Sequence, residues 1–127
     1  MKFFNLADGA LPIFSGEYRH AFIITINASG TTEATAANIP WNSPNPEYLI
    51  VRCHRVDGDN TGILLPRGPA AGSVIEIFTD NGSVIAYTYP GFEDIVPAEP
   101  FLDGSTSITV TSGARFRSTG GVWAKSD

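Results

Sequence analysis

The sequence predicts an all-β protein, a single compact antiparallel β-sandwich or a small Greek-key barrel with an extended N-terminal arm. The chain of 127 residues holds 12 Ile, 7 Val and 11 Thr but only 6 Leu and 1 Met. Such β-branched side chains fit a pleated sheet and are mildly disfavoured in helices. The 13 Gly and 9 Pro divide the chain into short segments. This length is typical of one domain, in which about two-thirds of the surface of the unfolded chain can be buried.

The first sixteen residues predict the arm. Residues 1–16, MKFFNLADGALPIFSG, are apolar but follow no period, and Gly9 and Pro12 interrupt them. We therefore expect an arm at 1–16 followed by a β-sandwich domain at 17–127. The aromatic side chains of the arm are Phe3, Phe4 and Phe14. They must pack either on their own domain or on a neighbouring molecule.

Two strands are predicted in the first half of the chain. Residues 18–27 alternate so that one face carries Phe22, Ile24 and Ile26. Residues 48–56 place Leu49, Val51 and Cys53 on one face and Ile50, Arg52 and His54 on the other. The polar residues 31–39 are a weak strand or a loop, and the proline-rich segment 40–46, which carries Trp41, is a loop. A short strand follows at 61–66.

The second half predicts a series of hairpins. Residues 73–79 and 83–89 flank Asp80-Asn81-Gly82, and Asn-Gly between two apolar runs indicates a type I′ turn. Later strands are expected at the segments 105–111, 114–117 and 122–125, after a long loop at 91–104. In total, eight or nine short strands, no helix and no convincing internal repeat are predicted.

Charge and hydropathy exclude several classes of protein. The net charge is −5 and the pI is about 4.8, which disfavours general nucleic-acid binding because phosphate contacts need a basic face. No apolar run is long enough for a transmembrane helix, and the start of the chain lacks the pattern of a signal peptide. We therefore expect no membrane partner and no secretion. A single cysteine, Cys53, forms no internal disulfide.

No catalytic, cofactor or metal site is predicted. Cys53 and His54 are adjacent in a strand, so their side chains point to opposite faces and do not ligate one ion together. Cys53 is interpreted as a small core residue, and His20 and His54 as surface residues. A nucleophilic pair of Cys53 with His20 would require neighbouring strands in register.

Two acidic segments resemble parts of functional sites, but the first is interpreted as a turn and the second as a solvated loop. Asp57, Asp59 and Thr61 resemble the start of a calcium loop, with Gly62 at the sixth position, but Gly68 stands where the loop needs its glutamate. The acidic loop residues are Glu93, Asp94, Glu99 and Asp103. They suggest a glycosidase carboxylate pair, although nothing in the sequence would raise the pKa of one of them. The sequence thus predicts a protein that is not an enzyme and has no cofactor.

Aromatic side chains in predicted loops indicate a contact surface. Loop aromatics either cap a sandwich or form an interface, and interface cores favour these residue types. The candidate interface residues are Phe3, Phe4, Phe14, Trp41, Tyr89, Phe92 and Phe101. An alternative is stacking on a sugar, with Trp41 and Phe92 beside Asn42, Asn45 and Asp94.

Residues 62–125, about half of the chain, carry a pattern of core and turn positions. Its elements are Ile63-Leu64-Leu65-Pro66, Ala70-Ala71-Gly72, Val74-Ile75-Glu76-Ile77, Asp80-Asn81-Gly82, Tyr87-Thr88-Tyr89-Pro90, Ile95, Ser107-Ile108-Thr109-Val110, Gly113-Ala114-Arg115-Phe116 and Gly120-Gly121-Val122-Trp123. This pattern resembles a β module that recurs in virion proteins of tailed bacteriophages, such as head fibres, capsid decoration proteins and tail-fibre segments. Residues 91–104 depart from this pattern, because they contain prolines and acidic residues where a more regular segment is expected.

The resemblance implies a structural virion protein. The nearest match is a capsid decoration (cement) protein, which binds the outside of the capsid and stabilises it; such proteins are often homotrimers. The implied partner is the major capsid protein, and the implied location is the capsid surface of the virion. The protein would be made in the host cytoplasm. The alternative is a tail-fibre or lectin-like module that binds a receptor or a carbohydrate.

Overall fold

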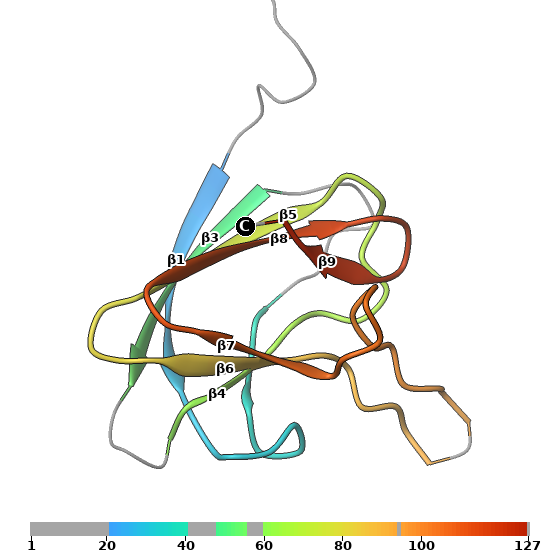
Figure 1. Cartoon of the computed structure of the whole chain (residues 1–127), viewed down its shortest axis with the longest axis horizontal. Coiled ribbons are helices and arrows are strands. Elements are labelled where there is room, and N and C mark those ends of the chain that lie inside the picture. The colour runs from blue at the N-terminus through green and yellow to red at the C-terminus, as the bar shows by residue number, and fades with distance from the viewer. Residues whose placement is uncertain (1–20, 41–47, 56–59, 94, 127) are drawn as a thin grey trace, which may run out of the picture.

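The computed structural model describes residues 21–40, 48–55, 60–93 and 95–126. These residues form nine β-strands and no helix, arranged in two sheets (Figure 1). The prediction of an all-β protein is therefore confirmed for the described part of the chain. The predicted arm at 1–16 lies outside it.

The larger sheet has five strands in the order β1-β3-β5-β8-β9. Their bounds are β1 Ala21–Ala28, β3 Tyr48–Arg55, β5 Val74–Thr79, β8 Gly113–Ser118 and β9 Trp123–Lys125. The first three run parallel to one another, whereas β8 is antiparallel to both β5 and β9. Hence the sheet is mixed.

The smaller sheet has four strands in the order β2-β4-β6-β7. Their bounds are β2 Ala37–Asn38, β4 Gly62–Leu64, β6 Val84–Tyr87 and β7 Ser107–Val110. Again the first three strands are parallel and the last is antiparallel. The prediction of an antiparallel fold is therefore wrong for both sheets.

The first six strands alternate between the two sheets, so the chain passes back and forth across the core. Ala21 pairs with Tyr48 and Tyr48 pairs with Val74, which are steps of 27 and 26 residues. Parallel neighbours need a crossover connection, and here each crossover carries a strand of the opposite sheet. The step from a strand of the larger sheet to a strand of the smaller sheet and back therefore repeats along the chain, although the sequence shows no convincing repeat.

The predicted hairpin at Asp80-Asn81-Gly82 is also wrong. The strands that flank it, β5 and β6, lie in different sheets. A type I′ turn needs a positive φ at both central residues, but only Gly82 has one, at +128°. Asn81 instead binds the end of β3: the Arg55 N–H donates to Asn81 Oδ1 at 2.8 Å, and Asn81 Nδ2 donates to the Arg55 carbonyl. These bonds direct the chain from one sheet to the other.

The core lies between the two sheets, which Figure 1 shows as two layers. Buried side chains from both sheets form one cluster, whose largest fully buried members include Phe116, Ile63, Leu65, Ile75 and Ile77. The predicted faces of β3 are confirmed, because Leu49, Val51 and Cys53 are buried while Arg52 and His54 are exposed.

Phe101 belongs to this core. Its side chain is 2% exposed and its ring stacks on Phe116 with a centroid distance of 5.5 Å. Although Phe101 was predicted to be an interface residue on a loop, its ring therefore points inward. The next residue, Leu102, is 64% exposed.

The neighbours Phe101 and Leu102 offer a matched test of the core. We expect Phe101→Ala to lower the free energy of unfolding by about 3–5 kcal/mol, because it removes a buried ring and leaves a cavity. We expect Leu102→Ala to change it by less than about 0.5 kcal/mol. Urea unfolding followed by tryptophan fluorescence measures both. Equal losses would contradict the placement of Phe101.

Candidate functional site

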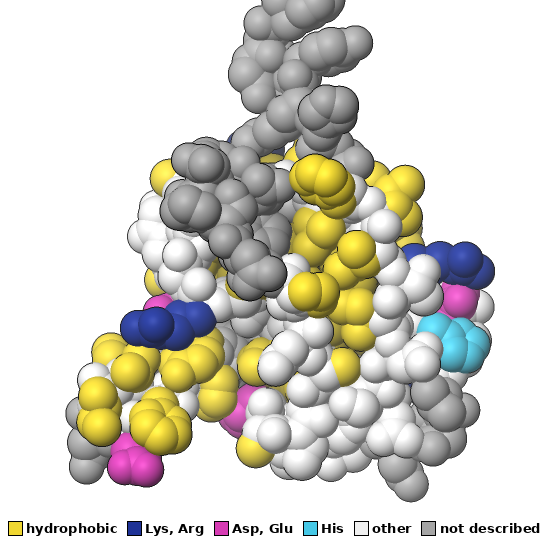
Figure 2. Space-filling view, turned by 180° about the vertical axis from the view of Figure 1, so that it is seen from behind, with side chains coloured by type: hydrophobic (Ala, Val, Ile, Leu, Met, Phe, Trp, Pro, Cys, Tyr) yellow, Lys and Arg dark blue, Asp and Glu magenta, His cyan; other side chains and the backbone are white. Residues whose placement is uncertain are grey.

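The described surface carries several large hydrophobic side chains that are about half exposed or more. They are Phe22, Ile23, Phe78, Phe92, Ile95 and Leu102. Scattered apolar residues are normal on a protein surface, but neighbouring ones mark interaction sites. Phe92 and Ile95 share one loop, which projects from the body of the molecule (Figures 1 and 2).

Main-chain hydrogen bonds close the tip of this projecting loop, of which residues 90–93 and 95–98 are described. The Phe92 N–H donates to the Val96 carbonyl at 2.8 Å, and the Val96 and Ile95 N–H groups donate to the Phe92 carbonyl at 3.2 and 3.1 Å. Phe92 is 55% exposed and Ile95 is 74% exposed. The main chain on the two sides of the tip is therefore hydrogen-bonded, while the side chains of Phe92 and Ile95 remain in contact with solvent.

Two unusual backbone conformations hold the tip. Glu93 has a φ of +51°, the only positive φ of a non-glycine residue in the described part of the chain. Gly91 has a φ of +90°, and a Cβ there would lie 2.8 Å from the Val96 carbonyl oxygen. Positive φ costs free energy at a residue with a side chain and is found often at binding sites.

Charged and aromatic side chains anchor the base of the loop to the segment after β4. Glu99 Oε1 accepts a hydrogen bond from the Gly68 N–H at 2.8 Å, and Glu99 Oε2 lies 3.5 Å from Arg67 Nε. The Arg67 guanidinium lies over the Tyr89 ring, 5.4 Å from its centroid. The Glu99 N–H donates to the Tyr89 carbonyl at 3.0 Å. The loop therefore leaves the body in a defined direction.

The candidate interface residues differ in where they lie. Phe92 lies at the loop tip, Tyr89 is half-buried at the loop base, and Phe101 is in the core. The remaining candidates, Phe3, Phe4, Phe14 and Trp41, lie outside the described residues, as do Asn42, Asn45 and Asp94. Ile95 is one position of the pattern that resembles virion β modules, but the sequence did not predict it to be an interface residue.

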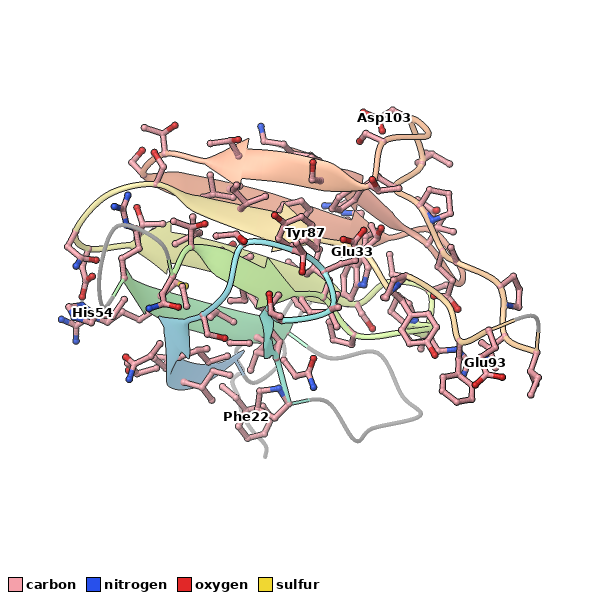
Figure 3. The ribbon with its side chains drawn as sticks, turned by 90° about the horizontal axis from the view of Figure 1, so that it is seen from below. Phe22, Glu33, His54, Tyr87, Glu93 and Asp103 are labelled. Atoms are coloured by element: carbon pink, nitrogen blue, oxygen red, sulfur yellow. The ribbon has the colours of Figure 1, made fainter. Side chains whose placement is uncertain are left out.

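Cys53 and His54 point to opposite sides of β3, as predicted. Cys53 is buried, and burial, with a smaller contribution from the charge of Asp80, raises the pKa of its thiol to about 11. On the other face lies His54, which is labelled in Figure 3; its Nδ1 is 3.0 Å from Asp80 Oδ1, and Arg52 Nη2 lies 3.6 Å from Asp80 Oδ2. His20, Asp57 and Asp59 lie outside the described residues.

No group of three or more His, Cys, Asp or Glu side chains within the described ranges is placed to hold a metal ion. In the predicted acidic loop Glu99 binds Gly68 and Arg67, and Asp103 accepts hydrogen bonds from the Ser105 hydroxyl and N–H at 2.7 and 2.9 Å. These hydrogen bonds lower the pKa of Asp103. Each of these two carboxylates therefore has its own partners.

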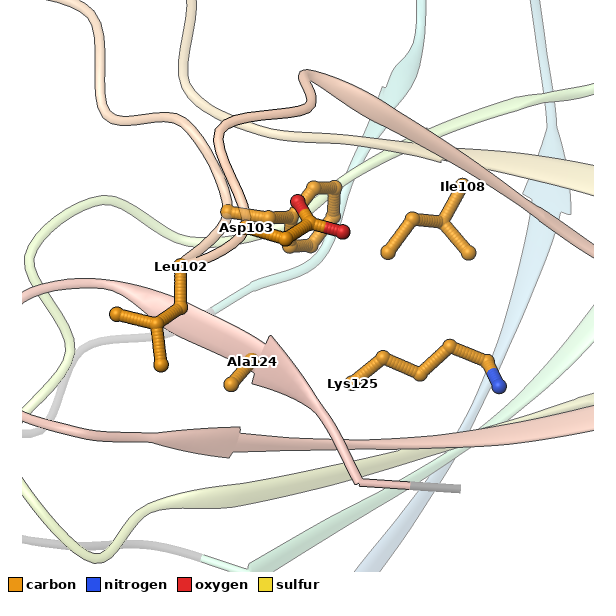
Figure 4. A pocket seen from close by; sticks show the side chains of 6 residues that line it. Leu102, Asp103, Ile108, Ala124 and Lys125 are labelled. Carbon is orange, nitrogen blue, oxygen red and sulfur yellow. The ribbon is translucent and has the colours of Figure 1, made fainter.

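A cavity of about 330 Å³ opens where the two sheets end at β7 and β9 (Figure 4). Its apolar lining comes from Phe101, Leu102, Ile108 and Ala124, and Asp103 and Lys125 supply its charges. Among the described residues that line it there is no histidine, cysteine, serine or threonine. The cavity offers apolar contact surface with one carboxylate and one amine at its side.

The outer face of the larger sheet carries a second polar cluster. Tyr48 donates its hydroxyl to Glu76 Oε2, Arg115 Nε lies 3.3 Å from the same oxygen, and the Arg115 guanidinium is 5.9 Å from the centroid of the Tyr48 ring. The hydrogen bond to Glu76 is the main cause of a raised pKa of Tyr48. Beside it, Phe78 and Gly113 line a shallow cavity of about 250 Å³. The alternation of Glu76 between Ile75 and Ile77 was the sequence signal for this face.

Comparison with known proteins adds no family to this description. No family model, no curated protein and no solved structure matches the chain. In the part of the chain that the structure describes, no helix has the length and hydropathy to cross a membrane.

The raised pKa of Cys53 predicts a thiol that is unreactive in the folded protein. With a pKa of about 11, only about one thiol in a thousand is ionised at about pH 8, and the sulfur is buried. We expect almost no release of colour from Ellman's reagent in native conditions and one equivalent in denaturing guanidinium chloride. Fast reaction of the native chain would show that the region around β3 opens readily.

Proposed function

We propose that this protein is a non-enzymatic structural virion protein, a capsid decoration protein that binds the outside of a capsid and stabilises it. The observation that carries the proposal is the projecting loop with Phe92 and Ile95 at its tip. The resemblance of residues 62–125 to virion β modules supports the same assignment.

The loop has the properties of a binding element. Burying one large apolar side chain contributes about 1.5–3 kcal/mol, and two such anchors lie within four residues. The hydrogen bonds of the tip and the anchored base hold the loop before it binds. A rigid loop loses little conformational entropy on association, so more of the contact energy appears as affinity.

The charge of the loop indicates the chemistry of its partner. Glu93 is exposed beside Phe92, and the whole chain carries a net charge of −5. An acidic tip is repelled by anionic lipid headgroups and attracted to an apolar pocket with a basic rim. We propose that the major capsid protein supplies such a pocket.

The ionisable groups support a role without catalysis. The thiol of Cys53 is buried and protonated, and His54 on β3 and Asp80 just after β5 are exposed to solvent. A protein that binds at the junctions of a shell needs complementary surface and no reacting group. We therefore propose that the protein is not an enzyme and has no cofactor.

The sandwich arrangement, the N-terminal arm and the oligomeric state are also part of the proposal. We propose that the two sheets, which share one core, are the layers of a β-sandwich with mixed sheets, and that the arm predicted at 1–16 packs either on its own domain or on a neighbouring subunit. The resemblance implies a homotrimer on the capsid surface, made in the host cytoplasm and not secreted. Repeated weak contacts in such an assembly would give high avidity.

Binding to shells tests the proposal. We expect the purified protein to bind undecorated capsids at a fixed stoichiometry and to raise their melting temperature. Phe92→Ala and Ile95→Ala are each expected to weaken binding about tenfold, because each removes an apolar anchor. Sedimentation with titrated shells measures the affinity.

Leu102→Ala is the matched control for these variants. Leu102 is as exposed as the loop residues but lies on another part of the surface, so its removal is expected to leave shell binding unchanged. Absence of binding to any shell, or an equal loss in the control, would contradict the proposal.

A carbohydrate-binding module is the second candidate, favoured by the outer face of the larger sheet. Phe78 is 48% exposed beside the Glu76–Arg115 pair, so an apolar ring lies next to groups that accept and donate hydrogen bonds. Sugars offer both an apolar face and hydroxyl groups. This function predicts signals on a glycan array that disappear in Phe78→Ala, with no binding to shells. A blank array would exclude it for the glycans displayed.

A further inference from the structure

The Asn81-Gly82 pair lies where the chain crosses from β5 to β6, and Asn81 is the only asparagine in the sequence that is followed by glycine. Both residues are exposed to solvent. In such a pair the main-chain nitrogen of the glycine reaches the side-chain amide of the asparagine easily, because glycine has no side chain to hinder the approach. The pair therefore carries a chemical reactivity that the proposed function does not use.

The reaction of such a pair is deamidation, for which water is the co-reactant. The Gly82 nitrogen loses its proton to the solvent and forms a bond to Cγ of Asn81, and Nδ2 leaves as ammonia. Water then opens the succinimide ring at one of its two carbonyl groups and yields aspartate or isoaspartate. One water is consumed and one ammonia is released for each asparagine converted.

Contacts with Arg55, at the end of β3, hold the turn in its unreacted form. The Arg55 N–H donates to Asn81 Oδ1 at 2.8 Å, and Asn81 Nδ2 donates to the Arg55 carbonyl, so both ends of the amide are bound to one main-chain segment. The Arg55 side chain covers Gly82, where an added Cβ would lie 2.8 Å from Nη1. The same Nη1 donates to the Ser83 carbonyl at 3.3 Å. One residue of β3 therefore contacts three consecutive residues of the turn.

These contacts oppose the attack on the amide. When the Gly82 nitrogen bonds to Cγ, this carbon becomes tetrahedral, and Oδ1 and Nδ2 leave the plane in which they face the N–H and C=O of Arg55. The main chain must also shift, although the Asp80 N–H is bound to the Cys53 carbonyl at 3.3 Å before Asn81 and the Ser83 carbonyl is bound to Arg55 after it. Reaction therefore requires the turn to detach from β3.

We infer that Asn81 is a deamidation site whose reaction is controlled by the attachment of the turn to Arg55. In the folded protein the attached amide is protected, and a chain in which the turn has detached is modified. The inference goes beyond the proposed function and does not depend on it. Shell binding and deamidation are measured separately, so either can fail without the other.

Modification in turn weakens the attachment. The product carries a carboxylate, which has no N–H to donate to the Arg55 carbonyl. Isoaspartate also lengthens the main chain of the turn by one carbon atom, which displaces Gly82 from its contact with the guanidinium. Deamidation therefore loosens the crossing between the two sheets, and refolding does not restore the amide.

The rate of deamidation gives the first test. The full chain and a free peptide of residues 78–84 are incubated in the same mildly alkaline buffer, and mass spectrometry follows the conversion of Asn81. The peptide has the Asn-Gly pair but lacks Arg55. We expect conversion to be at least about tenfold slower in the folded chain, because the loss of two hydrogen bonds precedes the reaction. Equal rates, faster conversion in the folded chain, or no conversion of the peptide would overturn the inference.

A side-chain variant tests the role of Arg55. Arg55→Ala keeps the main-chain bonds to Asn81 but removes the guanidinium from Gly82 and Ser83, and is expected to raise the rate about threefold. Arg117→Ala removes an exposed arginine from β8 of the same sheet and is expected to leave the rate unchanged. Circular dichroism checks that both variants fold. An unchanged rate in Arg55→Ala, or an equal rise in the control, would contradict this role.

The consequence of modification is tested with Asn81→Asp, which encodes one product. We expect its melting temperature to be lower by about 3–6 °C, because the Arg55 carbonyl loses its donor. Asn38→Asp introduces the same charge at an exposed position of β2 and is expected to shift the melting temperature by less than about 2 °C. Thermal unfolding followed by circular dichroism measures both. Equal shifts would overturn the inferred loosening of the crossing.

Discussion

The parallel pairing of β1, β3 and β5 is the constraint on which the rest of the structure depends. Parallel strands cannot be joined by a tight turn, so the chain must leave the sheet after each of them. In this protein it forms a strand of the second sheet before it returns. The two sheets are thereby built together, and the side chains that close the core, such as Val51 and Ile63, come from both of them. If one of these crossover connections failed to form, the apolar inner faces of both sheets would be exposed.

This path of the chain also positions the surfaces that matter for binding. After β6 the chain stays in the smaller sheet and reaches β7 through a long connection, and the loop with Phe92 and Ile95 is part of it. The same path starts at an edge, because no described strand lies beyond β1. The projecting loop and the open edge are separate features, and the first suits an apolar pocket on a partner.

Local patterns in the sequence predicted the faces of strands well and their partners poorly. Alternation identified Leu49, Val51 and Cys53 as buried and Arg52 and His54 as exposed, since side-chain direction depends on neighbours along the chain. The Asn81-Gly82 pair predicted a hairpin, but the hydrogen bonds of Asn81 to Arg55 are contacts between distant segments. Phe101 looked like a surface aromatic for the same reason, because its contact with Phe116 is not local.

The sequence by itself determined that this chain is a β-protein with short strands, which face of each long strand is apolar, and that Cys53 belongs to the core. These properties follow from side-chain shape and from a period of two, which neighbouring residues encode. Only the tertiary structure decided which strands pair, in which direction, and that Phe92 projects while Phe101 is buried. The parallel pairing of β1, β3 and β5 joins residues that are 26 or 27 positions apart, and main-chain hydrogen bonds are the same for every partner. The choice between partners therefore depends on how the whole core packs.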